Sequence, residues 1–401
     1  MSDAKYELLL KGGRVVDPAR GLDEVRDVAI RGTEIAAVER DIPASLAATV
    51  EDVSGNLVVP GLIDYHTHCY WGHNRISVHA DHIGAKSGVT TWVDTGSAGA
   101  ANFPGFYHHV IKTSAVDIIP YLNISWIGCA PFGPLFVPYN ELLDPRLLDS
   151  EEALRVCGEF EGVVAGIKLR ASSDVCGAHG MAALRIARFV ADAMRLPLMI
   201  HLSIPPLTVD DILPVLREGD TFTHCFTPFN VGVLDYDRKV RPIMRDAKER
   251  GVILDIGHGA GSFSFPVAEA AMGQGLLPDC ISTDLSRVSV DGPAYDLPTV
   301  MSKFLALGMS FDEVLDRATR RPAACLGLAD RLGGLAPGRT ADIAVLEFED
   351  GSVDFVDTRR NVRTGNRLIR AVKTIKGGRV LPPLANPGDE APTRRPGMPG
   401  T

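Results

Sequence analysis

Short apolar runs alternate with helix-like stretches through the middle of the chain, from about residue 57 onward. Eight runs fit buried strands: "NLVVPGLIDYHTH", "GVTTWVDTG", "DIIPYLNISWIG", "VAGIKLRAS", "LPLMIHLS", "TFTHCF", "GVILDIGH" and "CISTDLS". Between several of them, stretches such as "GMAALRIARFVADAMR" space apolar residues three and four apart, as an amphipathic helix does. Eight alternating β and α units predict an α/β fold, a (β/α)8 TIM barrel over residues 57–336.

The two ends of the chain carry a second, similar pattern. "KGGRVVD" at residues 11–17 and "KGGRVL" at 376–381 each follow a strand-like run. This likeness predicts that residues 1–56 and 337–384 pair in one small β-sandwich beside the barrel. Two unrelated hairpins with a common Gly-Gly turn are the alternative. The Pro- and Gly-rich stretch 385–401 predicts a disordered tail.

Composition and charge narrow the class of partner. The chain has 401 residues, 45% of them hydrophobic, and a net charge of -9. An acidic chain without a basic patch favours a small-molecule substrate over nucleic acid or a membrane surface. The uncharged segment 118–140 is interrupted by four prolines, which favours a buried strand and a loop over a membrane span. Seven scattered cysteines, none in a CxxC pair, and a start without signal-peptide features predict a cytoplasmic protein.

Polar side chains gather at the ends of the predicted strands. Asp64, His66 and His68 alternate at the end of the first run, so all three face one side of a strand. Further polar residues fall in or at the ends of later runs: Lys168, His201, His224 and Asp284. The carboxyl ends of barrel strands meet at one mouth, where four imidazoles and a carboxylate suit a metal site.

Lys168 fits this group only after chemical change. An ammonium repels a divalent cation, whereas a carbamate formed from the amine and CO2 would give an anionic oxygen to each of two metals. Each residue alone has a simpler interpretation: a paired or snorkelling lysine, a hydrogen-bonded core histidine, or a helix cap at Asp284. The coincidence of six such residues on one predicted rim favours the metal interpretation.

At these residues the chain resembles the amidohydrolase superfamily of metal-dependent hydrolases. "VVPGLIDYHTH", "GIKLR" and the tract from Ala318 to Leu346 are similar to family segments. The resemblance implies two divalent metals, with zinc expected, and a metal-bridging hydroxide that attacks an ester or amide carbonyl. It also implies the following ligands: His66, His68 and Asp284 for the more buried metal, His201 and His224 for the other, and carboxylated Lys168 between them. Asp284 would also carry the catalytic proton, and such barrels often form homo-oligomers.

Within the superfamily, "HTHCYWG" and "GIKLRAS" are most similar to a deacetylase branch often labelled dihydroorotase-like. This implies removal of an acetyl group from a small hydroxy or amino acid. Dihydroorotases typically carry an arginine two residues after the second histidine, where this chain has Tyr70. A cyclic amidase of the hydantoinase, dihydropyrimidinase or dihydroorotase kind is the alternative, and a non-catalytic scaffold is a remote one.

Five further residues are candidates for supporting roles. Asp64 either orients a histidine or anchors its strand end. Arg170, two residues after Lys168, either grips a substrate carboxylate or pairs with a neighbouring acid. His258 ends the seventh strand and is expected to face the mouth and donate a hydrogen bond to substrate. Tyr70 and Trp71 are expected to line the pocket wall.

Overall fold

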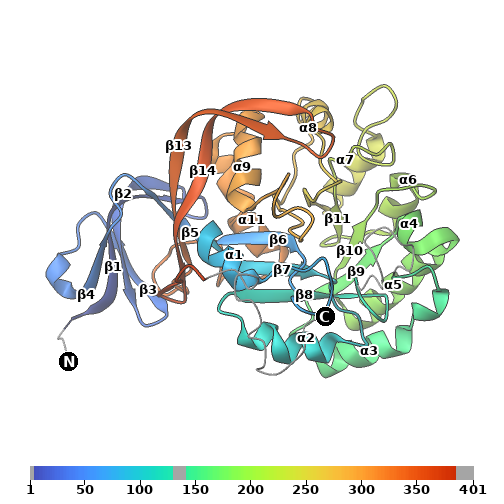
Figure 1. The fold of residues 1–401 in the computed structure, drawn as a ribbon, viewed down its shortest axis with the longest axis horizontal. Helices are drawn as coiled ribbons and strands as arrows, with labels where there is room; N and C mark the ends of the chain where they lie inside the picture. Colours follow the sequence, from blue (N-terminus) through green and yellow to red (C-terminus); the bar gives the residue numbers. More distant parts are fainter. Residues whose placement is uncertain (1–3, 130–140, 385–401) are drawn as a thin grey trace, which may run out of the picture.

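The computed structural model describes residues 4–129 and 141–384. It contains a parallel sheet surrounded by helices and a second sheet built from both ends of the chain (Figure 1). Residues 385–401, the predicted tail, lie outside the described residues, as does the 130–140 part of the uncharged segment. The mixed α/β class is confirmed.

Seven of the eight predicted runs form the parallel sheet, with neighbours in chain order. Its strands are β6 (Leu62–Thr67), β7 (Val89–Thr95), β8 (Asp117–Asn123), β9 (Gly166–Arg170), β10 (Leu198–His201), β11 (Thr221–Thr223) and β12 (Ile253–Leu254). Every residue of β6 and β7 is buried, because helices or the interior cover both faces. This double burial explains why the runs are apolar throughout instead of alternating.

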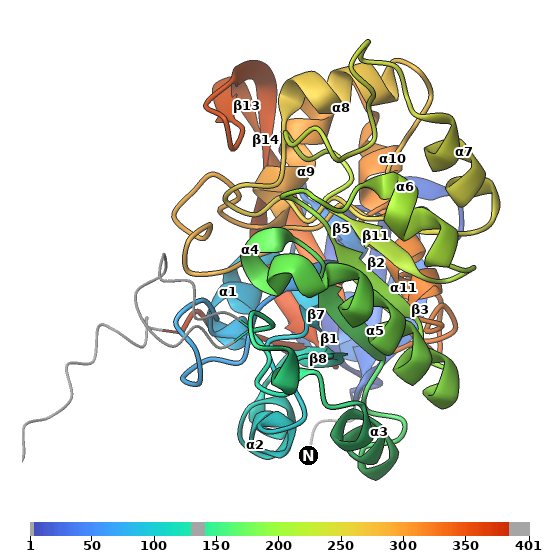
Figure 2. The same cartoon turned by 90° about the vertical axis from the view of Figure 1, so that its right-hand side faces the viewer.

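Helices connect these strands and cover the outside of the sheet (Figures 1 and 2). They are α1 (Ala80–Ser87), α2 (Phe103–His109), α3 (Ser150–Glu159), α4 (Ser173–Cys176), α5 (Gly180–Met194), α6 (Val209–Ile212), α7 (Pro242–Glu249), α8 (Phe265–Met272), α9 (Leu297–Ala306), α10 (Phe311–Asp316) and α11 (Arg320–Cys325). In α5 the buried residues Ala183, Leu184, Ala187 and Val190 repeat at helical spacing and pack in the main apolar cluster. Among the described residues, no helix is both long and apolar enough to cross a membrane.

The eighth predicted run, residues 280–285, differs from the other seven. It makes isolated parallel bridges, Asp255 with Cys280 and Thr67 with Leu285, instead of a continuous ladder. A side chain interrupts the ladder, because the backbone N–H of Thr283 donates to the Asp64 carboxylate at 3.0 Å. The segment therefore reaches from the end of β12 to the end of β6.

Strands from both ends of the chain share the second sheet, in which they meet through β5, just beyond the predicted segment 1–56. Its strands are β1 (Tyr6–Asp17), β2 (Leu22–Arg31), β3 (Glu34–Glu39), β4 (Ala47–Asp52), β5 (Leu57–Pro60), β13 (Ile343–Val356), β14 (Val362–Lys376) and β15 (Arg379–Val380). β5 joins the two sets, since it pairs with β1 on one side and β13 on the other. The strands form one continuous hydrogen-bonded sheet, and β13 and β14 arch over α9 (Figure 1).

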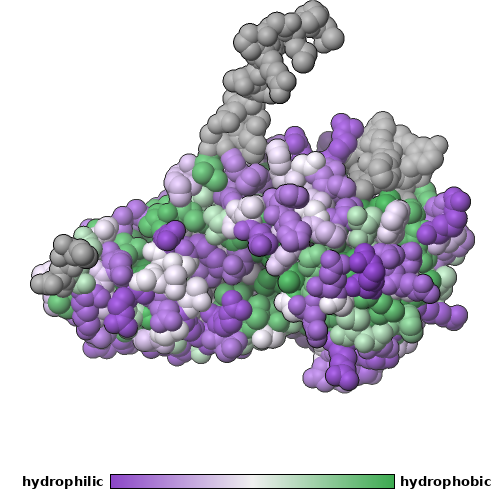
Figure 3. Space-filling model, turned by 90° about the horizontal axis from the view of Figure 1, so that it is seen from below, coloured by the Kyte–Doolittle hydropathy of each residue, from purple (hydrophilic) through white to green (hydrophobic). Residues whose placement is uncertain are grey.

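The run "NLVVPGLIDYHTH" is not the single strand that the sequence predicts. It forms β5 and β6, which belong to different sheets, with Gly61 between them. A side chain at Gly61 would collide with Thr90, so the change of direction needs glycine. The face of the molecule in Figure 3 mixes hydrophilic and hydrophobic residues, as expected for a globular protein.

Candidate metal centre

The six predicted ligands come together at the carboxyl end of the parallel sheet. They lie in or directly after the strands and in the 280–285 segment: His66 (β6), His68, Lys168 (β9), His201 (β10), His224 and Asp284. All except His224 line one cleft of about 230 Å³, together with Ile76, Cys129, Glu141, Arg170, Asp174, Ser286 and Val288. The predicted clustering is therefore present, while the roles of these residues as ligands stay predictions.

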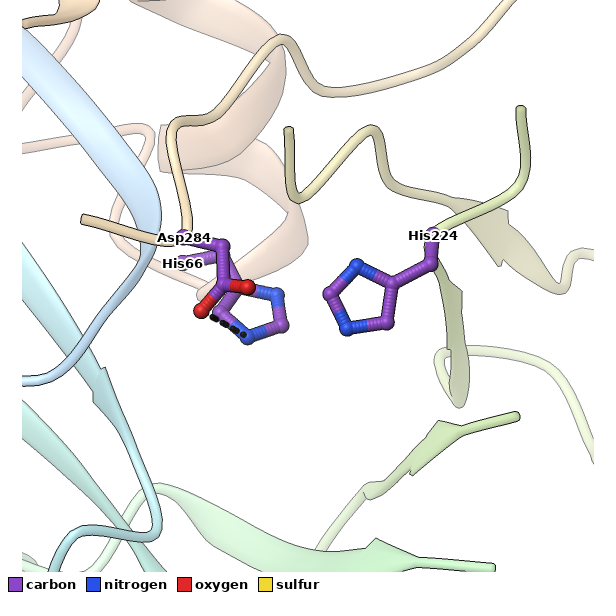
Figure 4. Close-up of side chains that lie close together, drawn as sticks. All are labelled: His66, His224 and Asp284. Atoms are coloured by element: carbon purple, nitrogen blue, oxygen red, sulfur yellow. Dashed lines mark ion pairs between the residues drawn. The ribbon is translucent and has the colours of Figure 1, made fainter. Parts of the chain in front are cut away.

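Three of these side chains already converge closely enough to share one cation. One ligand atom each from His66, His224 and Asp284 lies within 4.8 Å of the others (Figure 4). The Oδ1 atom of Asp284 lies 3.5 Å from Nε2 of His66 and 3.4 Å from Nε2 of His68. A carboxylate and several imidazoles thus point their donor atoms at a common space.

Hydrogen bonds outside the cleft fix which nitrogen of each histidine faces inward. The Nδ1 atom of His66 lies 3.1 Å from Oδ2 of Asp255 and 2.8 Å from Oγ1 of Thr223. A carboxylate only accepts, so Nδ1 carries the proton and the lone pair of Nε2 faces the cleft. In the same way Nδ1 of His224 donates to the carbonyl oxygen of Gly257 at 2.7 Å, which leaves its Nε2 unprotonated.

His201 and His224 form a second pair of inward nitrogens. The Nδ1 atom of His201 lies 2.7 Å from Nε2 of His224, and their rings meet edge to face with centroids 4.3 Å apart. Burial lowers the pKa of His201 well below its usual range and that of His224 to about 4. Burial also lowers the pKa of His66 well below its usual range. At neutral pH all three imidazoles are therefore neutral, the form that binds metal.

Lys168 is buried without a matching acceptor. The nearest partners of its Nζ atom are Nε2 of His66 at 3.4 Å and Sδ of Met199 at 3.5 Å. Within residues 4–129 and 141–384, no oxygen atom accepts a hydrogen bond from it. Burial lowers the pKa of Lys168 to about 8, so a reactive neutral amine is accessible near neutral pH. A buried amine whose partners are one histidine nitrogen and one methionine sulfur, set among neutral imidazoles and a carboxylate, fits a carbamate bound to divalent cations.

Two candidate ligands hold unusual backbone conformations. His224 has φ of 61° and Asp284 has φ of 47°, a left-handed region that non-glycine residues rarely occupy. Neighbouring bonds hold Asp284 in place, since Ser289 Oγ donates to its carbonyl oxygen at 3.1 Å and Thr283 is tied to Asp64. Such local strain concentrates at functional sites.

Comparisons with known proteins agree with this geometry. A model of the amidohydrolase family matches residues 240–382. A deacetylase of Agrobacterium fabrum is 36% identical over 356 residues, which are 88% of this chain and 86% of that protein. The chain belongs to the amidohydrolase family. It is therefore a hydrolase, as the resemblance implied.

Solved structures extend the likeness to the whole fold of this amidohydrolase. A crystal structure of an adenine deaminase superposes with a TM-score of 0.85 at 32% identity, covering 94% of this chain and 99% of that one. A crystal structure of a dihydroorotase gives a TM-score of 0.83 at 33% identity, covering 93% and 97%. The family generally uses divalent metals and acts on small molecules, in keeping with the histidine and aspartate cluster of this hydrolase.

Arg170 and Asp64 each take one of their two predicted roles. Arg170 lines the cleft of the amidohydrolase, and its guanidinium donates to Glu141 at 2.6 Å, the predicted ion pair with a neighbouring acid. Asp64 accepts from both the backbone N–H and Oγ1 of Thr283, at 3.0 and 2.6 Å. It therefore anchors the strand end and does not orient a histidine ring. Burial raises the pKa of Asp64 to about 7.

The expectation that His258 faces the mouth is wrong in this structure. His258 is fully buried, stacks on Phe263, and does not line the cleft. Both of its ring nitrogens have partners: Nδ1 donates to Gly259 at 2.9 Å, and Nε2 accepts from Lys303 at 2.8 Å. No nitrogen remains to bind substrate.

Tyr70 and Trp71 also lie away from the cleft, contrary to the prediction. Tyr70 turns outward from β6, stacks on His73 and Phe106, and donates to the carbonyl oxygen of Asn102 at 3.2 Å. Trp71 borders a separate, smaller cavity near α1. The backbone N–H of Cys69 donates to the Asp94 carboxylate of β7 at 2.8 Å, and further along the same loop Ile76 lines the cleft in place of these two side chains.

Sequence analysis overlooked three acids: Glu141 and Asp174 in the cleft wall, and Asp255 behind His66. Asp255 orients His66, and Glu141 holds Arg170. Asp255 had a detectable signal, because it interrupts the apolar run "GVILDIGH". Glu141 follows an irregular stretch with no strand or helix pattern, so the sequence contains no comparable signal.

Proposed function

We propose that this amidohydrolase is a binuclear metal-dependent deacetylase that removes an acetyl group from a small acetylated hydroxy or amino acid. The observation that carries the proposal is Lys168, a buried amine to which no oxygen of residues 4–129 and 141–384 offers an acceptor, set among neutral imidazoles and Asp284. A buried amine in this setting has a chemical reason to become a carbamate. The relative named as a deacetylase, identical at 36% of aligned positions, supports the acetyl group.

The proposed ligand sets follow the geometry of the donor atoms. His66, His68 and Asp284 would hold one cation, since their atoms approach within 3.4 and 3.5 Å. His201 and His224 would hold the other through the two nitrogens that now lie 2.7 Å apart. Lys168, once carboxylated, would contribute an oxygen to both groups. Zinc is the metal that we expect for such a histidine-rich set.

When bound, two divalent cations supply Lewis acidity toward a carbonyl oxygen and lower the pKa of water. Asp284 supplies the base. In the metal-free protein burial by itself would raise its pKa, but the hydrogen bond with His68 and the nearby nitrogen groups outweigh burial and keep the pKa below its usual range. In the metal-loaded protein, where Lys168 would be an anionic carbamate, the bound cations would favour the ionised carboxylate. The carboxylate is therefore ionised at neutral pH, ready to take a proton from the attacking water and pass it to the leaving group.

Arg170 is the proposed anchor for a carboxylate on the substrate. It lies on the cleft wall two residues from Lys168, and its side chain is 27% exposed. Glu141 is almost fully buried and holds one guanidinium nitrogen, so the fork has a fixed direction. A substrate acid bound there would bring its acetyl ester or amide toward the histidines.

We also propose the finer fold features that the sequence predicts. The bridges made by residues 280–285 support closure of the parallel sheet into an eight-stranded barrel within the predicted range 57–336, whose first four residues belong instead to β5 of the terminal sheet. The apolar cluster shared by β1, β2 and β13 supports a sandwich-like arrangement of 1–56 with 337–384. Seven unpaired cysteines support a reducing compartment such as the cytoplasm. A homo-oligomer stays a prediction, which light scattering would test.

The second candidate function is hydrolysis of a cyclic amide. The solved structure described as a dihydroorotase favours it, at 33% identity over nearly the whole chain. The loop after His68 argues against dihydroorotate itself, because Tyr70 packs on Phe106 and contributes no cation to the cleft. A scaffold without activity is disfavoured, since all six ligand positions hold competent side chains.

One experiment separates these functions. Metal content per chain is measured by plasma mass spectrometry, and the same protein is assayed on O-acetyl hydroxy acids, N-acetyl amino acids and cyclic imides. We expect about two metals per chain and hydrolysis of acetylated acids. Folded protein with at most one metal and no turnover would contradict the binuclear proposal, and turnover of cyclic imides alone would favour the second function.

Arg170→Met tests the carboxylate anchor in the same assay. We expect KM for an acetylated acid to rise about 10- to 100-fold, while the uncharged methyl ester of that substrate changes little. Arg155→Met, on the exposed face of α3, is the matched control and should leave both substrates unaffected. An equal rise in KM for the acid and for its methyl ester would show that Arg170 does not recognise the carboxylate.

A further inference from the structure

A pair of cysteine thiols lies at the end of the parallel sheet opposite the cleft. Cys280 begins the 280–285 segment, and Cys325 ends α11. Their sulfur atoms lie 3.9 Å apart, although 45 residues separate them in the chain. All seven cysteines of the protein are described and free, and among the described residues no other two cysteine sulfurs are in contact.

We propose that Cys280 and Cys325 are a redox-sensitive pair that closes into an intramolecular disulfide when a peroxide reaches Cys325. The proposal does not depend on the hydrolytic function and assigns a modification site that includes none of the proposed metal ligands. It would covalently join α11 to the segment that leads to Asp284.

The two thiols differ in access, as a peroxide-reactive pair requires. Cys325 is partly exposed and borders two surface cavities of about 390 and 370 Å³. Residues that precede the strands, such as Ala165 and Pro197, line the first cavity. Cys280 is fully buried. A small oxidant therefore meets Cys325 first, and Cys280 is the only cysteine in contact with it.

The packing around the pair keeps the sulfurs together. Tyr65, Tyr121 and Met199 form a buried cluster with Cys280, against which Cys325 packs. The backbone N–H of Ile281 donates to the carbonyl oxygen of Arg317 at 3.0 Å, which holds the 280–285 segment to the chain just before α11. Closure of the disulfide requires the two sulfurs to approach from 3.9 Å to about 2.05 Å.

The chemistry proceeds in two balanced steps with hydrogen peroxide as the oxidant. The Cys325 thiolate attacks one peroxide oxygen, an S–O bond forms, the O–O bond breaks, and the departing hydroxide takes up a proton as water. The Cys280 sulfur then attacks the Cys325 sulfur, the S–S bond forms, and the S–O bond breaks. The departing hydroxide takes the Cys280 proton, so two thiols lose two electrons and the peroxide becomes two waters.

The burial of Cys280 limits the rate at which its sulfur attacks the oxidised Cys325. Burial raises the pKa of the Cys280 thiol well above its usual range. Little thiolate is present at neutral pH, so closure is slow there and accelerates as the pH rises.

The test uses the full-length, metal-loaded protein. It is treated with a small excess of hydrogen peroxide, and free thiols are counted after unfolding, with intact mass and non-reducing peptide mapping in parallel. We expect two of the seven thiols to disappear, the mass to fall by about 2 Da, and one linked peptide pair to contain Cys280 and Cys325. Dithiothreitol should restore both thiols.

Two variants keep the test independent of folding. In Cys325→Ser, we expect all six remaining thiols to persist under the same treatment. In Cys280→Ala, Cys325 should be oxidised to a sulfenic or sulfinic acid without forming an intramolecular disulfide. Cys157→Ala, in α3, is the control and should lose two thiols as the parent does. All seven thiols persisting in the parent, loss of other cysteines, or oxygenated Cys325 without a link to Cys280 would each overturn the proposal.

Discussion

Lys168 and Lys303 are both buried lysines, each about 1% exposed, yet their surroundings differ. The Nζ atom of Lys303 donates to three acceptors: Nε2 of His258 at 2.8 Å, the carbonyl of Pro293 at 2.7 Å and that of Val356 at 2.8 Å. These three acceptors can receive every N–H group of the amine, whether it is charged or neutral. Lys168 has only a histidine nitrogen and a methionine sulfur, at 3.4 and 3.5 Å.

The different hydrogen-bond partners suit Lys303 to a structural role and Lys168 to the proposed carbamate. Lys303 joins the end of the seventh predicted strand, the loop after residue 285, and β13 of the terminal sheet. Lys168 gains little from its surroundings as an ammonium, because a buried polar group without partners costs about 1–3 kcal/mol or more. A carbamate with bound cations would remove that cost. The two lysines are equally buried, so the difference in their expected roles comes from their hydrogen-bond partners.

Replacing each lysine by methionine tests whether their roles differ. We expect the largest loss of turnover in Lys168→Met. In Lys168→Met we expect turnover to fall by about 10³-fold or more and metal content to drop, because the residue would link both cations. Carbon-13 NMR of protein equilibrated with labelled bicarbonate checks the carbamate directly. The carbamate signal should be present in the parent and absent in Lys168→Met.

Lys303→Met is the control for that experiment and should keep its metal and its carbamate signal. If Lys168→Met retained two metals and full activity, the chemical role of Lys168 would be excluded. Loss of metal from Lys303→Met instead would mean that the two lysines do not differ as their partners suggest.

Lys303→Met should have its main effect on stability. It leaves two backbone carbonyls and His258 without their donor inside the protein, which we expect to lower the free energy of unfolding by about 2–4 kcal/mol. Urea unfolding followed by circular dichroism measures this change. Lys112→Met, at an exposed position next to α2, should change stability by less than about 0.5 kcal/mol.

The parallel sheet was predictable because its strands are apolar throughout and its helices repeat at regular spacing. Two details were not. The break at Gly61 depends on the approach of Thr90, and the interrupted ladder of residues 280–285 depends on the bond between Asp64 and Thr283. Both are contacts between segments far apart in the chain, which no local pattern encodes.

The metal cluster was predictable because strand ends converge, but strand ends alone did not separate His224 from His258. Both follow apolar runs, and only His258 finds Lys303, which lies on α9. Arg170 was predictable only as two alternatives, because its partner Glu141 follows a stretch without secondary-structure signals. The sequence shows where His258 and Arg170 lie along their strands, but it does not show which residues they contact, and those contacts determine their roles.

Asp255→Asn tests how much the hydrogen bond between Asp255 and His66 contributes to metal affinity at the cleft. Asp255 accepts from His66, from Thr223 at 2.6 Å and from Ser282 at 2.5 Å, all of which donate. An amide would present a donor to at least one of them and weaken the His66 tautomer. We expect metal affinity to fall by about 10- to 100-fold, measured by competition with a chelator. Asp246→Asn, at an exposed position of α7, should leave affinity unchanged.

The smallest effect concerns pH and arises at Lys303. Burial lowers its pKa from 10.5 to about 7 in the folded protein, whereas the unfolded chain keeps the ordinary value. Between these two values the unfolded chain holds a proton that the folded protein has released, so stability should rise with pH, by no more than about 1.4 kcal/mol per unit. Urea unfolding between pH 7 and 9 measures the slope in the parent and in Lys303→Met. If the slope persisted unchanged in Lys303→Met, another buried group would be its source, and the matched acceptors would hold the ammonium across the whole range.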